Sequence, residues 1–443
     1  MKSIILINLP ARAYISKDMA KTYSYNPSIS LMSLGAYLEL HGYCVKIFDL
    51  CIDRIPRENL IDIIANEMPL LVGISVYTEN LSVANKLASA IKQINNEIKI
   101  CLGGPGATLD FDSSKTMHVD FSIFGEGEST LLELVECIAS NEKIISYEDI
   151  EGLYFNDGSE SRVNKTRGFI KDLDLLPIIK RELCDFGRFT GMVNISSSRG
   201  CPGKCIFCAA SALSGASYRV RDVKNLYMEL VYLSNSIGER SVIFYFVDDT
   251  FTAIPRRVEE FTNIITESNI KLLWHCESRV DVINKDLIAK MKMSGCVSMQ
   301  FGLESGSQLV LNSIKKNIDL QKALEAIRLT SEAGITMVVS FILGHYCDTK
   351  DSMMKTVELI KELYDVYAVE VALSYNTPFP GTWQYINRDK IGLKIVVEEP
   401  EKWTLVEPVA ETDNFTINDL REIYNLAFPY LNQLSKVFTH DNE

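Results

Sequence analysis

Three closely spaced cysteines, Cys201, Cys205 and Cys208, are the residues of this sequence best suited to chemistry. They follow the spacing C-x3-C-x2-C, and the glycines and the proline around them disfavour regular secondary structure. Three thiolates on one such loop can each bind one iron of a cubane iron–sulfur cluster and leave the fourth iron open. Zinc sites usually have a fourth Cys or His ligand, so they fit the triplet less well. Three reduced cysteines buried in a core are the remaining interpretation.

The composition indicates an acidic, globular protein. The chain has 443 residues, of which 47% are hydrophobic and 23% charged, as expected for about two or three soluble domains. The net charge of −13 disfavours a nucleic-acid partner, because phosphate binding needs clustered Lys and Arg. Eleven cysteines without a regular framework indicate a reducing compartment. We see no signal peptide and no apolar stretch long enough to span a membrane, so we expect a cytoplasmic protein without a membrane partner.

Residues 1–150 alternate short β-branched runs with helical patterns, which predicts an α/β domain with a Rossmann-like, doubly wound parallel sheet. Gly103 and Gly104 follow the fourth expected strand, and Gly125, Glu126 and Gly127 follow the fifth. Such loops let a ligand approach the backbone at the carboxyl edge of an open sheet. Two tight turns without a ligand are the alternative. The expected strands are 3–8, 44–49, 70–76, 98–102 and 121–124, and the expected helices are 29–41 and 82–94.

The rest of the chain predicts a linker, a second α/β domain and a short tail. Residues 151–189 have the pattern of a linker with a small hairpin, and residues 391–443 that of a helical tail, with one helix at 417–438. Between them, residues 190–390 predict a partial (β/α)6 TIM-like barrel. The cysteine triplet follows the first barrel strand, at the face where such barrels place their chemistry. The expected strands are 192–197, 241–247, 271–276, 297–302, 336–343 and 369–375, and the expected helices include 256–267 and 320–333.

The cysteine loop, with Phe207 before its last cysteine, resembles the cluster loop of radical S-adenosylmethionine (radical SAM) enzymes. Further motifs over most of the chain resemble the branch of that family with an N-terminal cobalamin-binding domain. In the first domain they are Leu34-Gly35-Ala36-Tyr37-Leu38, Gly42-Tyr43, Val72-Gly73-Ile74-Ser75, Gly103-Gly104-Pro105 and Gly125-Glu126-Gly127-Glu128. In the second they are Tyr218-Arg219-Val220-Arg221, Phe246-Val247-Asp248-Asp249-Thr250-Phe251, Gly302-Leu303-Glu304-Ser305-Gly306 and Phe341-Ile342-Leu343-Gly344.

The resemblance implies three cofactors and a set of binding residues. A [4Fe–4S] cluster on the three cysteines would bind S-adenosylmethionine at its open iron and reduce it to a 5′-deoxyadenosyl radical, with electrons from an external donor such as flavodoxin or ferredoxin. Phe207 would pack near the adenine, and Asp249 and Glu304 would make polar contacts to the nucleoside or methionine part. Both carboxylates can instead cap a following helix. The implied cobalamin-binding residues are Ser75, Gly103, Gly104, Gly125, Glu126 and Gly127.

Two departures leave cobalamin binding open. The D-x-H-x-x-G signature of proteins that supply a histidine ligand is absent, although members of this branch commonly bind cobalamin without one. Gly106 also stands after Gly-Gly-Pro, where relatives often have a larger polar residue. Some family members keep the fold with a vacant cobalamin site. A bound cobalamin and a vacant scaffold domain are therefore both compatible with this sequence.

The leading hypothesis is a cobalamin-dependent methyltransferase that acts on an unactivated carbon of a small specialised metabolite or a peptide. The second is a radical SAM epimerase or cyclase with a vacant cobalamin domain and Cys347 as hydrogen-atom donor. Cys347 lies in Gly344-His345-Tyr346-Cys347-Asp348, where relatives usually carry Gly-x-Pro-Gly-Glu. It can also be a small packed side chain. The third hypothesis is a noncatalytic iron–sulfur sensor, which needs neither an open iron nor a barrel.

Overall fold

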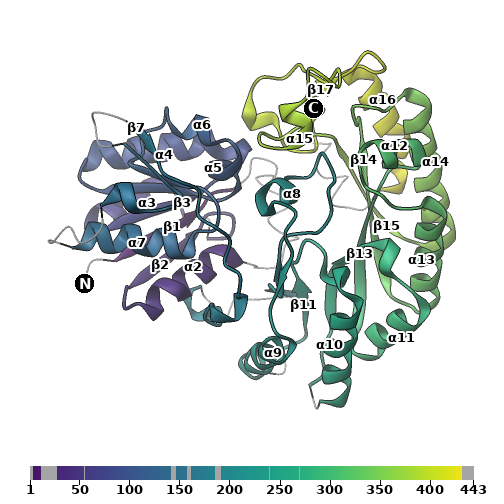
Figure 1. Cartoon of the computed structure of the whole chain (residues 1–443), viewed down its shortest axis with the longest axis horizontal. Coiled ribbons are helices and arrows are strands. Elements are labelled where there is room, and N and C mark those ends of the chain that lie inside the picture. Colours follow the sequence, from purple (N-terminus) through teal and green to yellow (C-terminus); the bar gives the residue numbers. More distant parts are fainter. Residues whose placement is uncertain are drawn as a thin grey trace. The chain divides into compact units, whose positions relative to one another are not determined.

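The structure, a computed structural model, describes residues 3–10, 27–53, 55–140, 146–156, 161–184, 191–238, 240–268 and 270–431. The chain divides into two compact units, Met1–Phe189 and Thr190–Glu443 (Figure 1).

The first unit is built on a seven-stranded sheet with the strand order β2-β1-β3-β4-β5-β6-β7. The first five strands along the chain are parallel, as the alternating pattern predicts, and the last two pair antiparallel as a hairpin. The strand order reverses at β1, which is where open α/β sheets form ligand crevices. The strands are β1 (Ile4–Asn8), β2 (Val45–Asp49), β3 (Leu71–Ser75), β4 (Lys99–Gly103), β5 (Phe121–Ile123), β6 (Leu153–Asn156) and β7 (Ser161–Val163).

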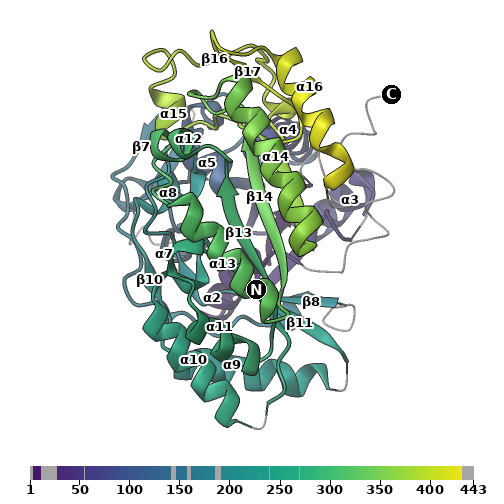
Figure 2. The same cartoon turned by 90° about the vertical axis from the view of Figure 1, so that its right-hand side faces the viewer.

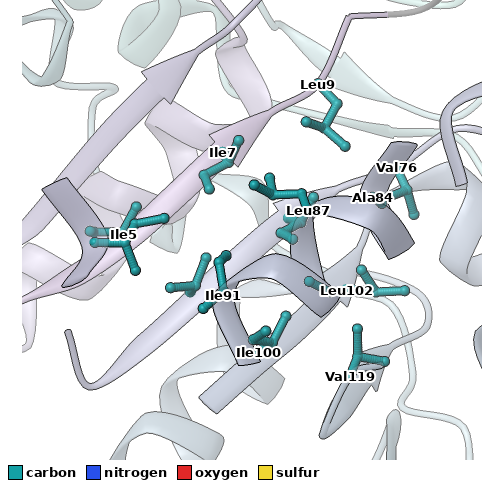
Figure 3. Packing of buried hydrophobic residues seen from close by; sticks show 14 of the residues in the cluster. Ile5, Ile7, Leu9, Val76, Ala84, Leu87, Ile91, Ile100, Leu102 and Val119 are labelled. Atoms are coloured by element: carbon teal, nitrogen blue, oxygen red, sulfur yellow. The ribbon is translucent and has the colours of Figure 1, made fainter. Parts of the chain in front are cut away.

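Helices cover both faces of this sheet (Figure 1). Because successive side chains of a strand point to opposite faces, Ile5 and Ile7 of β1 pack with α3 and α4, whereas Ile4 and Leu6 pack with α2 and α7. Figure 3 shows the first of these two clusters. Each fully buried Ile or Leu in it contributes about 1.5–3 kcal/mol through the hydrophobic effect. The helices are α2 (Ile29–Leu40), α3 (Arg57–Glu67), α4 (Leu81–Ile94), α5 (Pro105–Leu109), α6 (Phe111–Ser114) and α7 (Glu128–Ala139).

Two features of this unit go beyond the sequence-based expectation. The small hairpin expected within residues 151–189 is β6-β7, but it also extends the sheet of this unit through the antiparallel pairing of β5 with β6. Helices α3 and α7 were not predicted. Among the described residues, neither has a side-chain cap at its first turn, so the usual start signal is missing from the sequence.

The second unit is a half-barrel of six parallel strands in the order β15-β14-β13-β12-β11-β8. This is a fold of the predicted type, a partial (β/α)6 barrel. Figure 2 shows α13 and α14 along the outer face of β13 and β14. The strands are β8 (Gly191–Ile195), β11 (Val242–Phe246), β12 (Trp274–Ser278), β13 (Cys296–Glu304), β14 (Thr336–Leu343) and β15 (Glu370–Tyr375). The helices are α8 (Ala209–Ser214), α9 (Val223–Ile237), α10 (Pro255–Glu267), α11 (Lys285–Met293), α12 (Gln308–Ser313), α13 (Leu320–Glu332), α14 (Lys350–Tyr367), α15 (Trp383–Ile386) and α16 (Ile417–Ala427).

Strand side chains of the half-barrel alternate between the helices and the inner face. Phe246 and Trp274 point toward α10, where they pack with Phe251 and Phe261 at ring-centroid distances of 4.5 to 5.7 Å. The third strand was expected at 271–276 but runs over Trp274–Ser278. The predicted strand begins too early because apolar residues precede Trp274, whereas the strand itself carries polar side chains on its inner face.

The tail contains a shorter helix than predicted. Helix α16 ends at Ala427 instead of continuing to residue 438, and a single 3-10 turn, Phe428–Tyr430, follows it. Pro429 lacks a backbone N–H and disfavours helical geometry in the residue before it, so the helix ends there. Residues 432–438 of the expected helix lie outside the described residues.

Candidate active site

The cysteine loop lies between β8 and α8 and is held from two sides. It begins after β9 (Ser198–Arg199), which pairs antiparallel with β10 (Arg219–Val220). The backbone N–H of Ile206 donates to the Ile314 carbonyl at 3.1 Å, and the Ile206 carbonyl accepts from the Gln384 N–H at 3.1 Å. The backbone of the loop is therefore fixed by the protein itself.

The thiols of the loop crowd around Gly203. A Cβ atom at this glycine would lie 3.2 Å from Sγ of Cys201, 3.9 Å from Sγ of Cys205 and 3.7 Å from Nη1 of Arg279. The Gly203 N–H also donates to Sγ of Cys201 at 3.4 Å. Within the described ranges, no three His, Cys, Asp or Glu side chains close on one point as a single metal ion requires. In a cubane cluster each thiolate binds a different iron, so the ligands need not meet at one point.

Burial raises the pKa of all three cluster thiols, that of Cys208 to about 11. The positive charges of Lys316 and Arg279 oppose this effect at Cys201 and Cys205. The metal-free loop therefore carries thiols at neutral pH, and iron binding must displace their protons. The two cations then offset part of the negative charge of an iron–thiolate cluster.

Glu304 forms a buried ion pair with Lys316. Its Oε1 lies 2.7 Å from Nζ of Lys316, and the two side chains are 10% and 13% exposed. Glu304 ends β13 with φ +70° next to a register shift in the sheet. That conformation is costly for a residue with a side chain, and such residues concentrate at functional sites. A Cβ at Gly302 would lie 2.5 Å from Glu304 Oε1, so the glycine makes room for the pair.

The two aspartates after β11 have different surroundings. Asp248 is buried and accepts hydrogen bonds from the backbone N–H of Ser197 at 2.7 Å and of Ser198 at 3.0 Å, and from the Ser197 hydroxyl. It thereby fixes the segment that leads into the cysteine loop. Asp249 is exposed, and its charge raises the pKa of Cys201 and of Cys208. The motif in the sequence points to Asp249, whereas the anchoring role of Asp248 is visible only in its hydrogen bonds to Ser197 and Ser198.

Residues 344–348 form the next wall of the site. Asp348 accepts hydrogen bonds from the backbone N–H of Gly344 at 3.1 Å and of His345 at 2.9 Å, and from the Ser352 hydroxyl at 2.6 Å. Asp348 thus holds this turn closed, although the sequence of the turn departs from the Gly-x-Pro-Gly-Glu pattern that relatives usually carry. The ring of His345 packs 5.0 Å from that of Phe207 in the cysteine loop.

Cys347 lies beside α12. A side-chain hydrogen bond joins it to Ser313 and lowers the pKa of its thiol, but burial and the Asp348 charge outweigh this effect and raise the pKa to about 11. The role of Cys347 as hydrogen-atom donor stays a prediction.

The inner face of the half-barrel is polar. Tyr245 donates from its hydroxyl to Glu277 at 2.8 Å, and its ring meets His275 edge-on at 4.7 Å. Burial lowers the pKa of His275 to about 4 and raises that of Glu277. Gln300 donates to the Ser340 hydroxyl at 3.2 Å. The sequence could have revealed these inner-face residues, because they are polar side chains at every second position of a strand.

In the first unit, the predicted glycine loops meet at the carboxyl edge of the sheet. Ser75 and Gly103 are direct partners in the pairing of β3 with β4. A Cβ at Gly103 or at Gly125 would have no atom within 4 Å, so both positions border open space. Gly104 differs, because its Cβ would lie 3.0 Å from the Ser75 hydroxyl, and like Gly125 it has a positive φ, here +95°.

The remaining loop residues are occupied by packing. Oε2 of Glu126 accepts from the Ile170 N–H at 2.7 Å, and a Cβ at Gly127 would lie 3.2 Å from Leu34. A Cβ at Gly106 would lie 2.8 Å from the backbone of Tyr77. This close approach explains why Gly106 replaces the larger residue of the family pattern.

Comparison with known families agrees with this arrangement. The family model of the B12-binding domain matches residues 15–135, and that of the radical SAM superfamily matches residues 195–360. The chain is a radical SAM protein with an N-terminal B12-binding domain. The family predicted from the sequence is confirmed. The prediction of an enzyme, as opposed to a noncatalytic sensor, is confirmed as well. The two domains also confirm the predicted cofactor set, whereas the assignment of single residues to each cofactor stays a prediction.

Three similar proteins illustrate the range of the family. The chain is 27% identical to an uncharacterised methyltransferase of Pyrococcus horikoshii over 96% of this chain and 91% of the relative. It is 25% identical to the anaerobic magnesium-protoporphyrin IX monomethyl ester cyclase of Rubrivivax gelatinosus over 93% and 75%. The fold matches that of the radical SAM methyltransferase TsrM from Kitasatospora setae, solved with cobalamin and a [4Fe–4S] cluster, with a TM-score of 0.77 and 15% identity over 98% and 89%. Within the described ranges, no helix is long and apolar enough to cross a membrane.

Proposed function

We propose that this protein is a cobalamin-dependent radical SAM methyltransferase that methylates an unactivated carbon of a small polar molecule or a peptide. The observation that carries the proposal is the combination of a preorganised three-thiol loop, flanked by Lys316 and Arg279, with an open glycine edge in a B12-binding domain. When bound, the cofactors supply the radical and the methyl-group chemistry, and the protein supplies orientation and exclusion of water.

In the second unit, each polar element has a task in this proposal. Cys201, Cys205 and Cys208 hold the cluster. The ion pair of Glu304 with Lys316 and the exposed carboxylate of Asp249 orient the polar groups of S-adenosylmethionine, because they lie around the same loop. Phe207 packs against the nucleoside. The polar inner face around Tyr245 and Glu277 holds the substrate, which favours a molecule with hydrogen-bonding groups.

In the first unit, the open positions at Gly103 and Gly125 admit the corrin ring, and Ser75 lies beside Gly103. Gly104 allows the backbone its positive φ and, without a side chain, leaves room for the Ser75 hydroxyl. Glu126 and Gly127 contribute by shaping the loop instead of contacting the corrin ring, because Glu126 binds the Ile170 N–H and Gly127 packs against Leu34.

The experiment uses S-adenosylmethionine labelled on its methyl group. The anaerobically reconstituted protein is given this compound, cobalamin and a reductant, and the products are separated by chromatography. We expect the label to move to cobalamin, with S-adenosylhomocysteine as co-product, and a separate formation of 5′-deoxyadenosine. The triple variant Cys201→Ala/Cys205→Ala/Cys208→Ala should lose the second product. No movement of the label with a complete cluster and bound corrinoid would contradict methyl transfer.

A second candidate is radical cyclisation without methyl transfer. It is supported by the similarity to the cyclase of Rubrivivax gelatinosus. The hypothesis of an epimerase or cyclase that uses Cys347 as hydrogen-atom donor belongs to this candidate. The same experiment distinguishes it, because the label would then stay on sulfur-containing products while 5′-deoxyadenosine still formed.

The reaction also needs electrons from outside the protein. We propose a small electron carrier such as flavodoxin or ferredoxin as donor and a reducing cytoplasm as the setting, which fits the eleven cysteines of the chain.

A further inference from the structure

His345 is a fully buried histidine at the carboxyl end of β14. Neither of its ring nitrogens has a hydrogen-bond partner among the described residues. The other histidines of the described ranges, His41, His118 and His275, each have one. A buried polar atom without a partner costs about 1–3 kcal/mol, and each such atom in a native protein requires an explanation.

The ring of His345 is held in place by its surroundings. Asp348 binds the backbone N–H groups of Gly344 and His345, and Nδ2 of Asn376 donates to the Gly344 carbonyl at 3.1 Å. The ring itself packs against Phe207 at 5.0 Å. Three residues thus fix the backbone and one face of the imidazole, while its nitrogens stay unsatisfied. This arrangement is preorganised for a partner that the chain does not provide.

The imidazole is neutral at physiological pH. Burial, and to a lesser degree the charge of Lys316, lowers the pKa of His345 to about 3. A neutral imidazole has one N–H donor and one acceptor nitrogen. It is therefore suited to an uncharged polar heterocycle and gains little from a carboxylate or a phosphate.

We propose that His345 hydrogen-bonds the adenine of S-adenosylmethionine and is a specificity residue for the nucleoside. The inference rests on the proposed function, in which Phe207, the ring neighbour of His345, packs against that nucleoside. Adenine presents an amino donor beside ring-nitrogen acceptors, so it can pair with one nitrogen of a neutral imidazole whether that nitrogen donates or accepts. One of the nitrogens that the chain leaves unsatisfied is thereby satisfied when the cofactor binds.

The binding experiment compares three proteins in their reconstituted, unreduced form. Parent, His345→Phe and His345→Gln are titrated calorimetrically with S-adenosylmethionine, its 7-deaza analogue and its inosine analogue. We expect His345→Phe to bind S-adenosylmethionine about tenfold more weakly, as for a lost buried hydrogen bond, and to discriminate less against one of the two analogues. His345→Gln keeps a donor and an acceptor and should retain part of the affinity. Equal affinities and equal discrimination in all three proteins would overturn the proposal and assign the nitrogens to another ligand.

A stability measurement on the metal-free proteins separates this role from a structural one. His345→Phe removes two unsatisfied atoms while keeping an aromatic ring, so its thermal midpoint should equal or exceed that of the parent. The matched control His275→Phe removes a nitrogen that is bonded to Ser298, so its midpoint should fall. A lower midpoint for His345→Phe with unchanged cofactor affinity would show a structural role. A parent protein that carries a full cluster and binds no S-adenosylmethionine would refute the proposed function itself.

Discussion

Replacing Lys316 by Met should strongly destabilise the second unit. The two side chains have similar length, so the change mainly removes the ammonium group that lies 2.7 Å from Glu304. The carboxylate is 10% exposed and would stay buried without its counter-charge. Breaking a buried pair in this way costs about 3–5 kcal/mol, because the remaining ion has lost its hydration without compensation. Adding Glu304→Gln to the same protein should restore most of this loss, since no isolated charge remains.

The assay is urea denaturation of the metal-free chain, followed by tryptophan fluorescence. All three tryptophans of the chain, Trp274, Trp383 and Trp403, belong to the second unit, so the signal reports its unfolding. The control is Lys290→Met, which breaks a half-exposed pair with Glu259 and should cost about 1 kcal/mol or less. Equal effects of the two lysine substitutions, or a double variant less stable than Lys316→Met, would refute this account of the pair.

Three further predictions concern other parts of the molecule. Gly103→Leu should abolish cobalamin retention with unchanged iron content, because its side chain would enter the open space at the sheet edge; the control Asn66→Leu, at the far end of α3, should retain both, and corrinoid and iron analysis measures them. Burial raises the pKa of Asp348 to about 6, above its usual value near 3.8, so the folded state binds the extra proton between these values. The parent should therefore lose about 2 kcal/mol of unfolding free energy relative to Asp348→Asn as pH rises from 4 to 7, measured by denaturation at each pH, and an unchanged difference would contradict the buried carboxylate. Cys347→Ala should leave methyl transfer largely intact, whereas an epimerase would stop with 5′-deoxyadenosine formed and no deuterium entering product from heavy water.

Most of the fold was accessible from the sequence because buried parallel strands are continuous β-branched runs. The strand β14 was predicted at its observed bounds, and β1 within one residue. The strand β12 was displaced because its inner face carries His275 and Glu277, whose polarity hides the apolar positions between them. Local patterns also cannot show that α3 packs on the sheet through Leu60 and Ile64 despite its weak termini.

The candidate site was predictable where its residues lie close together in the sequence. The cysteine triplet is such a case, and so is Phe207. Lys316 and His345 escaped notice because their roles depend on contacts with residues distant in the chain, namely Glu304 and Phe207. An isolated lysine or histidine has no spacing that sets it apart. The same limit applies to Gly104, because only the structure shows its left-handed backbone.

The most direct test of the central claim is anaerobic reconstitution of the full chain, followed by iron, sulfide and corrinoid analysis, an absorbance spectrum and a 5′-deoxyadenosine assay. We predict about four irons and four sulfides per chain with the absorbance of a [4Fe–4S] cluster, a bound corrinoid, and nucleoside release on reduction. The variant lacking Cys201, Cys205 and Cys208 should lose the cluster and the nucleoside product while keeping the corrinoid. Release of 5′-deoxyadenosine by that variant would contradict the account.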